Sequence, residues 1–346
     1  MEGRAVEGID EGRVTAWFVA NVEGAEAPLR FELVAGGRSN LTFRVTDGAG
    51  HDYVLRRPPT SHVLPTAHDM GREHRVVSAL APTPVPVPPV LGYCADPEVT
   101  GQPFYVMAFV GGHVLRTAEA SATELDQGGR AAAGASLVDV LADLHAVDID
   151  EVGLSGLGRQ DGYIERQLRR WYGQFRQSAG LLGRPVPAVD EVHDRLSGRI
   201  PPQGRATIVH GDYRLDNTML DDGGRVVAVL DWEICTLGDP LADVGLLNVY
   251  WNEPGDARPT LTAPTMTPGF ASREEMMARY AKRSGRDLSE LGYYVAFGYW
   301  KLACILEGVQ ARYAGGAMGG DRTGVELFTE QVDGLAEAAL DAAAAL

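Results

Sequence analysis

Strand-like and helical patterns occupy different parts of this chain, and the change falls near Gly111-Gly112. Before that point apolar and polar residues mostly alternate, as they do in half-buried strands. Five prolines between residues 82 and 89 end the long helical segment of this part. After a short leading helix at 9–20, the predicted order is three strands, one helix and two strands (29–35, 41–47, 52–57, 66–81, 90–94 and 103–108).

Beyond residue 111 the patterns are mainly helical, with three short strands in between. We expect an α+β chain of two lobes: residues 1–110, an antiparallel sheet with one helix, and residues 111–346, mostly helical. The length of 346 residues, 45% of them hydrophobic, is enough for a large core and more than one lobe. The predicted helices of the second part are 130–147, 161–178, 186–197, 239–251, 272–284, 287–313 and 322–345, and its strands are 206–209, 218–221 and 225–230.

The short strands surround polar residues with a defined spacing. His210-Gly211-Asp212 follows the first of these strands, Asn217 lies five residues after Asp212, and Asp231 follows the third strand. An aspartate placed in this way can orient and deprotonate a hydroxyl, and amide and carboxylate oxygens are ligands that Mg²⁺ prefers. The pattern predicts transfer of the γ-phosphoryl group of ATP. Asp212 is the predicted catalytic base, and Asn217 and Asp231 are the predicted ligands of Mg²⁺.

The same motif carries a family resemblance. Residues 210–217 and 229–233 resemble the aminoglycoside phosphotransferase family, which has a protein-kinase-like fold. The resemblance runs from about residue 10 to about residue 315. It implies a nucleotide-binding N-lobe (1–110) and a C-lobe (111–346) with the catalytic loop and the acceptor site. Five further stretches resemble the branch related to the kinase domain of acyl-CoA dehydrogenase fusion proteins (36–42, 53–59, 62–70, 163–167 and 236–243).

Three residues near the motif are expected to support it. His210 is counted with the catalytic residues, although we expect it to hold the loop by hydrogen bonding more than to perform acid–base work. Glu233 is a candidate substrate residue that either contacts the metal through water or caps a turn. Asp243, on the following helix, is expected to brace the catalytic loop.

The predicted nucleotide site departs from the usual kinase pattern, because no lysine precedes Lys282. Kinases generally place a lysine on the third strand and pair it with a helix glutamate. Strand alternation puts Val54 and Arg56 on one face, so we expect Val54 over the adenine and Arg56 at the phosphates. Arginine binds phosphate bidentately, and Glu73 is its expected partner. Arg57 takes this role if the strand register is shifted by one.

Two backbone segments complete the predicted nucleotide site. The loop with Gly36, Gly37, Ser39 and Asn40 would cover the phosphates, because glycines allow close approach and exposed N–H groups bind phosphate oxygens. Taken alone, the same stretch reads as a hairpin turn. The segment from Met107 to Phe109 would bind the adenine edge through its backbone, whereas its apolar side chains alone indicate only a strand core.

The acceptor is expected to be a small molecule with a hydroxyl group. The helix at 161–178 carries Arg166, Arg169 and Arg170, which form either a solvated face or a surface that attracts a carboxylate or CoA phosphates. An aminoglycoside would instead require carboxylates. A hydroxyacyl-CoA or hydroxy acid is therefore favoured. The alternatives are an aminoglycoside antibiotic phosphotransferase and, in another class, a catalytically inactive nucleotide-binding regulator.

Composition excludes several other partners. The net charge of −16 opposes nonspecific binding to nucleic acid, which depends on neutralising phosphates. No apolar run approaches the roughly 18–20 residues that span a bilayer. The first twenty residues are acidic, unlike a signal peptide, and the three cysteines are widely spaced. We expect a cytoplasmic protein without a membrane or nucleic-acid partner, and the sequence leaves its oligomeric state open.

Overall fold

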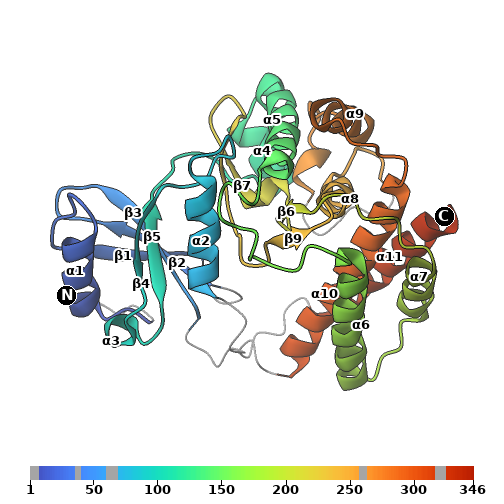
Figure 1. The fold of residues 1–346 in the computed structure, drawn as a ribbon, viewed down its shortest axis with the longest axis horizontal. Coiled ribbons are helices and arrows are strands. Elements are labelled where there is room, and N and C mark those ends of the chain that lie inside the picture. The colour runs from blue at the N-terminus through green and yellow to red at the C-terminus, as the bar shows by residue number, and fades with distance from the viewer. Residues whose placement is uncertain (1–7, 36–39, 60–68, 257–262, 316–324) are drawn as a thin grey trace. The chain divides into compact units, whose positions relative to one another are not determined.

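The chain folds into two compact units (Figure 1). The computed structural model describes residues 8–35, 40–59, 69–256, 263–315 and 325–346. The first unit is Met1–Gly111 together with the short segment Asp231–Glu233. The second unit is Gly112–Leu230 together with Ile234–Leu346. The chain therefore returns to the first unit for three residues, and these begin with Asp231.

A five-stranded antiparallel sheet forms the first unit, with the strand order β1-β2-β3-β5-β4. Each strand lies within one residue of its predicted bounds. The pairing of β3 with β5 sets Val54 opposite Met107 and Arg56 opposite Tyr105. The strands are β1 (Arg30–Ala35), β2 (Leu41–Thr46), β3 (Asp52–Arg57), β4 (Val90–Cys94) and β5 (Phe104–Ala108).

Residue alternation gives the two faces of this sheet different neighbours. On one face, α1 (Glu11–Asn21) contributes Phe18 to an apolar core with the strands. On the opposite face, α2 (Met70–Leu80) places Met70 in a smaller cluster against which Val54 packs. Figure 1 shows the two helices on opposite sides of the sheet. Successive residues of β3 therefore face the core and helix α2 in turn, and Val54 lies on the α2 face.

Aspartates begin the helices of the first unit. Asp10 and Asp69 each accept a hydrogen bond from the backbone N–H three residues later, which is the geometry of an N-cap. A third helix, α3 (Pro97–Thr100), was not predicted. Asp96 caps it and proline occupies its first turn, so the local signal was present but only four residues long.

The second unit is mainly helical. Its helices are α4 (Ala118–Glu124), α5 (Gln127–Ala146), α6 (Tyr163–Leu182), α7 (Pro187–Gly198), α8 (Leu241–Tyr250), α9 (Arg273–Ser284), α10 (Leu291–Ala314) and α11 (Val325–Ala344). Short 3₁₀ turns occupy Leu215–Asn217 and Pro264–Met266. Two antiparallel strand pairs join β6 (Thr207–Val209) to β9 (Thr236–Gly238) and β7 (Thr218–Leu220) to β8 (Val226–Val229).

Helix α10 is the central element of the second unit. It packs against α6, α8 and α11, and Trp300 is completely buried in the resulting core. The alanine-rich tail forms a packed helix, as expected, because Val332 and three alanines of α11 are buried in the same core. Figure 1 shows α11 alongside α10.

The predicted fold class, an antiparallel sheet followed by a mostly helical part, is confirmed. Two elements of the second unit were not predicted, α4 and β9. Strand β9 has three residues and exists through its pairing with β6, so no local alternation could reveal it. Within the described ranges, no helix combines the length and the apolarity needed to cross a membrane.

Candidate active site

The predicted catalytic loop, residues 210–217, begins directly after β6, and Asp243 of α8 holds its first two peptide groups. The Oδ2 atom of Asp243 accepts the N–H of His210 at 2.7 Å, and Oδ1 accepts the N–H of Gly211 at 2.8 Å. The predicted bracing of the loop by Asp243 is therefore present. Gly211 has φ of +87°, and a Cβ atom there would lie 3.1 Å from the Ile234 side chain. Both conditions favour glycine at this position.

The buried carboxylate of Asp243 keeps its charge through these contacts. Burial raises its pKa, but a hydrogen bond from His145 at 3.4 Å and the loop N–H groups outweigh that effect. The pKa of Asp243 consequently lies below its ordinary value. An ionised carboxylate accepts hydrogen bonds from the loop more strongly than a neutral acid would.

His210 is fully buried, and both nitrogens of its ring bond to the main chain. Nδ1 accepts the N–H of Asp212 at 3.2 Å, and Nε2 donates to the carbonyl of Leu230 at 2.9 Å. This arrangement fixes the tautomer with hydrogen on Nε2. It favours a role in holding the loop over acid–base work on a substrate.

The carboxylate of Asp212 is oriented from both sides. Oδ1 accepts the hydroxyl of Tyr250 at 3.0 Å, and Oδ2 accepts Nδ2 of Asn217 at 2.9 Å. Burial, followed by the charge of Asp212, raises the pKa of Tyr250 well above its ordinary value, so its hydroxyl remains a donor. The Asp212 side chain is still 30% exposed, and each oxygen has a second lone pair for a substrate hydroxyl.

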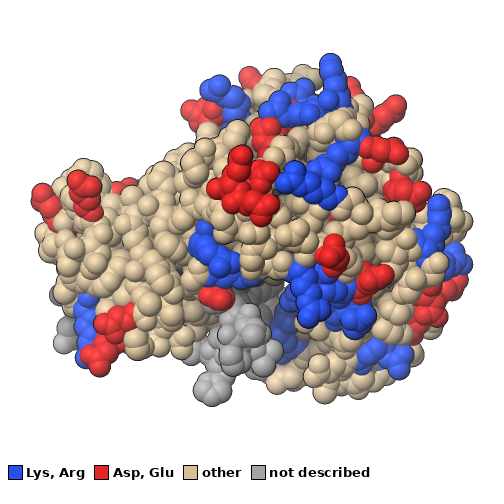
Figure 2. Space-filling view, viewed as in Figure 1, with Lys and Arg blue, Asp and Glu red and all other residues tan. Residues whose placement is uncertain are grey.

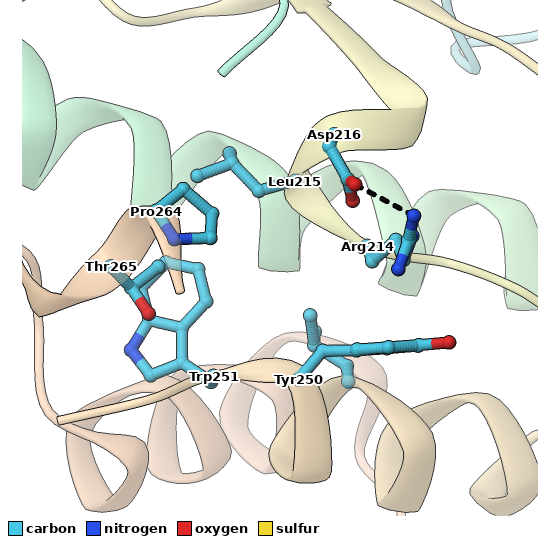
Figure 3. Close-up of a pocket in the computed structure, with 8 residues that line it drawn as sticks. Arg214, Leu215, Asp216, Tyr250, Trp251, Pro264 and Thr265 are labelled. Atoms are coloured by element: carbon cyan, nitrogen blue, oxygen red, sulfur yellow. Dashed lines mark ion pairs between the residues drawn. The ribbon is translucent and has the colours of Figure 1, made fainter. Parts of the chain in front are cut away.

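Sequence reasoning missed a pocket whose lining includes Arg214 and Tyr250, the residue that donates to Asp212 (Figure 3). The Nε atom of Arg214 lies 3.7 Å from Oδ2 of Asp212, and its guanidinium pairs with Asp216 at 2.7 Å and stacks on the Tyr250 ring. Nε of Arg214 is buried without a hydrogen-bond partner among the described residues. The signal was visible in the sequence, since Arg214 lies two residues after Asp212. The lining residues are Arg214, Leu215, Asp216, Leu247, Tyr250, Trp251, Pro264 and Thr265.

In the first unit, Arg56 joins two acidic residues. Its Nε lies 3.0 Å from Oε1 of Glu73 on α2, and its terminal nitrogen lies 2.5 Å from Oδ1 of Asp231. The expected ion pair of Arg56 with Glu73 is present. Burial opposes the charge of Arg56, but Glu73 and Asp231 outweigh it and raise the pKa of the guanidinium. Arg57 is buried on the opposite face, where its Nε donates to the carbonyl of Pro58, so the register that assigns Arg56 is the correct one.

Glu73 depends on Arg56 for its charge. Only 2% of its side chain is exposed, and burial raises its pKa while Arg56 lowers it. The net pKa remains above the ordinary value. Asn40, which follows the predicted phosphate loop, directs Nδ2 toward Glu73 at 3.5 Å and toward Glu233 at 3.3 Å. Asn40 thus connects the Arg56–Glu73 pair to the segment that contains Asp231.

The backbone of Asp231 is in an uncommon conformation. Its φ of +63° is the only positive value among non-glycine residues in the described ranges. Left-handed backbone at such a residue is typical of functional turns, where surrounding contacts maintain it. Here the contact with Arg56 restrains the side chain, which remains 34% exposed.

The other predicted nucleotide residues are only partly described. Gly36, Gly37 and Ser39 lie outside the described residues. Met107 is buried between its partner strands, and the N–H of Ala108 is bonded to the carbonyl of Pro89. The backbone groups of Phe109 make no hydrogen bond within the described part of the chain. Phe109 is therefore the member of this segment with backbone groups open to a ligand.

The three arginines of α6 have different surroundings. Arg166 donates to the carbonyl of Arg159, Arg170 stacks on Trp171 at 4.9 Å, and Arg169 is exposed. Figure 2 shows basic side chains gathered over α6 on the face that it draws. The surface is therefore basic where the sequence predicted it.

The loop in the second unit and the segment of Asp231 in the first unit each contain side-chain oxygen atoms of the kind that Mg²⁺ prefers. Among the described residues, no group of three or more His, Cys, Asp or Glu side chains could hold a metal ion alone. Mg²⁺ does not require one, because it is usually bound by one or two protein oxygens together with substrate phosphates. Nδ2 of Asn217 donates to Asp212, which leaves Oδ1 of Asn217 available to a metal ion. Arg56 bonds to Oδ1 of Asp231, and Oδ2 of Asp231 has no hydrogen bond within the described ranges.

Comparisons with known proteins agree with this chemistry. The model of the phosphotransferase enzyme family matches residues 30–275. The chain belongs to this family. A relative from chicken (Gallus gallus), named acyl-CoA dehydrogenase family member 11, is 35% identical over 318 residues, which cover 89% of this chain and 39% of that protein. The chain thus spans about two fifths of the length of that relative.

Solved structures give the fold of the family. A structure from Ralstonia eutropha, described as a "putative aminoglycoside phosphotransferase", is 33% identical with a TM-score of 0.82, and covers 97% of this chain and 98% of its own. Choline kinase from Cryptosporidium parvum has a TM-score of 0.66 at 12% identity, with 96% and 95% covered, and shares the fold alone. The protein-kinase-like fold and the assignment to small-molecule phosphotransferases are confirmed at the level of the family.

Proposed function

We propose that the chain transfers the γ-phosphoryl group of Mg·ATP to a hydroxyl of a small molecule. The supporting observation is the catalytic loop, in which Asp212 has an accessible carboxylate oriented by Tyr250 and Asn217. Asp212 would accept a hydrogen bond from the acceptor hydroxyl and take its proton during transfer. His210 and Asp243 would keep the loop in the required conformation.

The nucleotide is assigned to the first unit. We propose that Arg56 orients the α- and β-phosphates, that Glu73 holds Arg56, and that Val54 packs on the adenine. Arg56 is held by two carboxylates, so its guanidinium is oriented before any nucleotide binds. Backbone groups of Phe109 would bind the adenine edge, and the loop with Gly36, Gly37, Ser39 and Asn40 would cover the phosphates.

Asn217 and Asp231 are proposed as the ligands of Mg²⁺. Each has one oxygen atom that the described protein does not use. The bound ion would neutralise charge that develops on the phosphates. Glu233, which accepts a hydrogen bond from Asn40, would help to position the segment of Asp231.

An acidic acceptor, such as a hydroxy acid or a hydroxyacyl-CoA, fits the basic surface of α6. Arg166, Arg169 and Arg170 would attract its carboxylate or phosphates. The second candidate is an aminoglycoside, which the description of the Ralstonia eutropha structure favours. We also propose a cytoplasmic location, in which the three widely spaced cysteines would stay reduced.

One screen tests these assignments. The purified chain is incubated with radiolabelled ATP and Mg²⁺, together with hydroxyacyl-CoAs, hydroxy acids, aminoglycosides, choline or sugars. Phosphorylation of an acidic acceptor, lost in Asp212→Ala, is the expected result. Preference for an aminoglycoside would overturn the acceptor assignment. Nucleotide binding in a thermal-shift assay, without phosphorylation of any acceptor and without ATP hydrolysis, would identify an inactive regulator instead.

A further inference from the structure

Lys301 is a buried cation in the middle of α10. It is one of only two lysines in the chain, and 4% of it is exposed. Lysine is rarely buried unless it is paired, because an ammonium loses much hydration free energy in an apolar core. Within the described ranges Lys301 has no carboxylate at ion-pair distance. An unusual burial of this kind needs a reason.

The ammonium bonds to the catalytic loop. Nζ of Lys301 donates to the carbonyl oxygen of Gly211 at 2.7 Å, and it lies 5.8 Å from the centre of the Trp171 ring. The carbonyl of Gly211 and the N–H of Asp212 belong to one peptide group. That N–H is itself bonded to Nδ1 of His210. Lys301 and His210 therefore hold the two ends of the peptide from which the Asp212 side chain extends.

We propose that Lys301 is a positioning residue for phosphoryl transfer, whose ammonium fixes the Gly211–Asp212 peptide and thereby the direction of the Asp212 carboxylate. This inference rests on the proposed function. Asp243 fixes the two preceding N–H groups, so α8 and α10 together restrain the loop at three successive peptide groups. A displacement of about 1 Å at such a site is enough to reduce turnover about 100-fold.

The surroundings of Lys301 shift its pKa in both directions. Burial lowers the pKa of Lys301 below the ordinary 10.5, Asp212 and Asp243 raise it, and Arg170 lowers it. These groups come from the three elements packed around the ammonium, namely the loop, α8 and α6. Loss of the proton at alkaline pH would weaken the bond to Gly211, because a neutral amine is a poorer donor.

The test compares Lys301→Met and Lys301→Arg with Lys282→Met, which changes the other lysine, an exposed residue of α9. Phosphate release from Mg·ATP is measured with water as the acceptor, together with the melting temperature and hydrogen exchange of residues 210–213. For Lys301→Met we expect about 10- to 100-fold slower turnover, a KM for ATP within about twofold, and faster exchange in the loop. Lys301→Arg should recover part of the turnover, and Lys282→Met should behave as wild type.

A merely structural lysine gives a different result. In that case turnover falls only as the melting temperature falls, and Lys301→Met and Lys301→Arg are equally impaired. That result, or wild-type exchange and turnover in Lys301→Met, would overturn the inference. If the wild type neither hydrolyses ATP nor phosphorylates any acceptor of the screen, the proposed function fails, while unchanged loop exchange in Lys301→Met would separately refute the contact. With only two lysines, ¹³Cε-lysine labelling also gives a directly assignable titration of Lys301.

Discussion

Replacing Arg56 by alanine tests the charge cluster of the first unit. Nε of Arg56 lies 3.0 Å from Oε1 of Glu73, and at an effective dielectric of about 20 two charges at this distance attract by about 5.5 kcal/mol. Asp231 adds little, because 34% of its side chain is exposed. Removing one partner of a buried pair costs about 3–5 kcal/mol, since the other charge remains buried. We expect Arg56→Ala to lower the free energy of unfolding by about this amount at pH 8.

The loss of stability in Arg56→Ala depends on pH, because removing Arg56 changes the pKa of Glu73. Burial already raises the pKa of Glu73 above the ordinary 4.5, and removing Arg56, which lowers it, raises it further. Above pH 4.5 the unfolded chain releases this proton, whereas the folded variant retains it up to the raised pKa. The folded variant then binds more protons, so its stability falls as the pH rises through that window. The difference from wild type should therefore be smaller at pH 5 than at pH 8.

Urea unfolding followed by circular dichroism measures both effects, and titration with Mg·ATP measures nucleotide affinity. Arg56→Ala/Glu73→Gln should recover much of the stability, because no charge is left unpaired, while affinity for ATP stays low. Arg56→Lys should retain ATP binding, and Arg75→Ala, an exposed arginine of α2, serves as control. The reasoning is wrong if the double variant is no more stable than Arg56→Ala. It is also wrong if Arg57→Ala weakens ATP binding while Arg56→Ala does not.

Three further outcomes are expected for the loop, for the proposed ligands of Mg²⁺ and for Lys301. Asp212→Ala should slow phosphoryl transfer by about 10²–10⁴-fold or more with ATP affinity nearly unchanged, and near-normal turnover would remove Asp212 from the mechanism. Asp231→Ala should abolish the part of nucleotide binding that depends on Mg²⁺, and Asn217→Ala should weaken it. Isothermal titration calorimetry with ATP, with and without Mg²⁺, measures this part. An unchanged affinity of Asp231→Ala for ATP in the presence of Mg²⁺ would contradict the assignment. Turnover should fall as the pH rises through the lowered pKa of Lys301, because the ammonium then loses its proton. Between that pKa and the ordinary 10.5 the unfolded chain binds more protons than the folded chain, so the free energy of unfolding rises with pH. In Lys301→Arg a pH–rate profile should place this fall at higher pH, and an unmoved profile would assign it to another group.

Local patterns in the sequence were sufficient for much of this protein. Alternation in β3 assigns Val54 and Arg56 to the same face, because side chains of a strand alternate regardless of what surrounds it. The spacing from Asp212 to Asn217 is also local, and it brings the two side chains into contact across one short turn. Fold class followed from the same periodicities. The four-residue α3 and the three-residue β9 were missed because segments so short carry too little pattern.

Tertiary structure decided which distant residues serve the loop. Tyr250 is 38 positions from Asp212 and Lys301 is 90 positions from Gly211, yet both donate hydrogen bonds to this loop. From the sequence alone, Tyr250 lies at the end of an apolar helix, and Lys301 is a polar residue within another helix. Their roles depend on how α8 and α10 pack, and therefore on which buried donors meet which carbonyl and carboxylate oxygens. A buried polar group must find its partner within the folded core, and no spacing along the chain records that requirement.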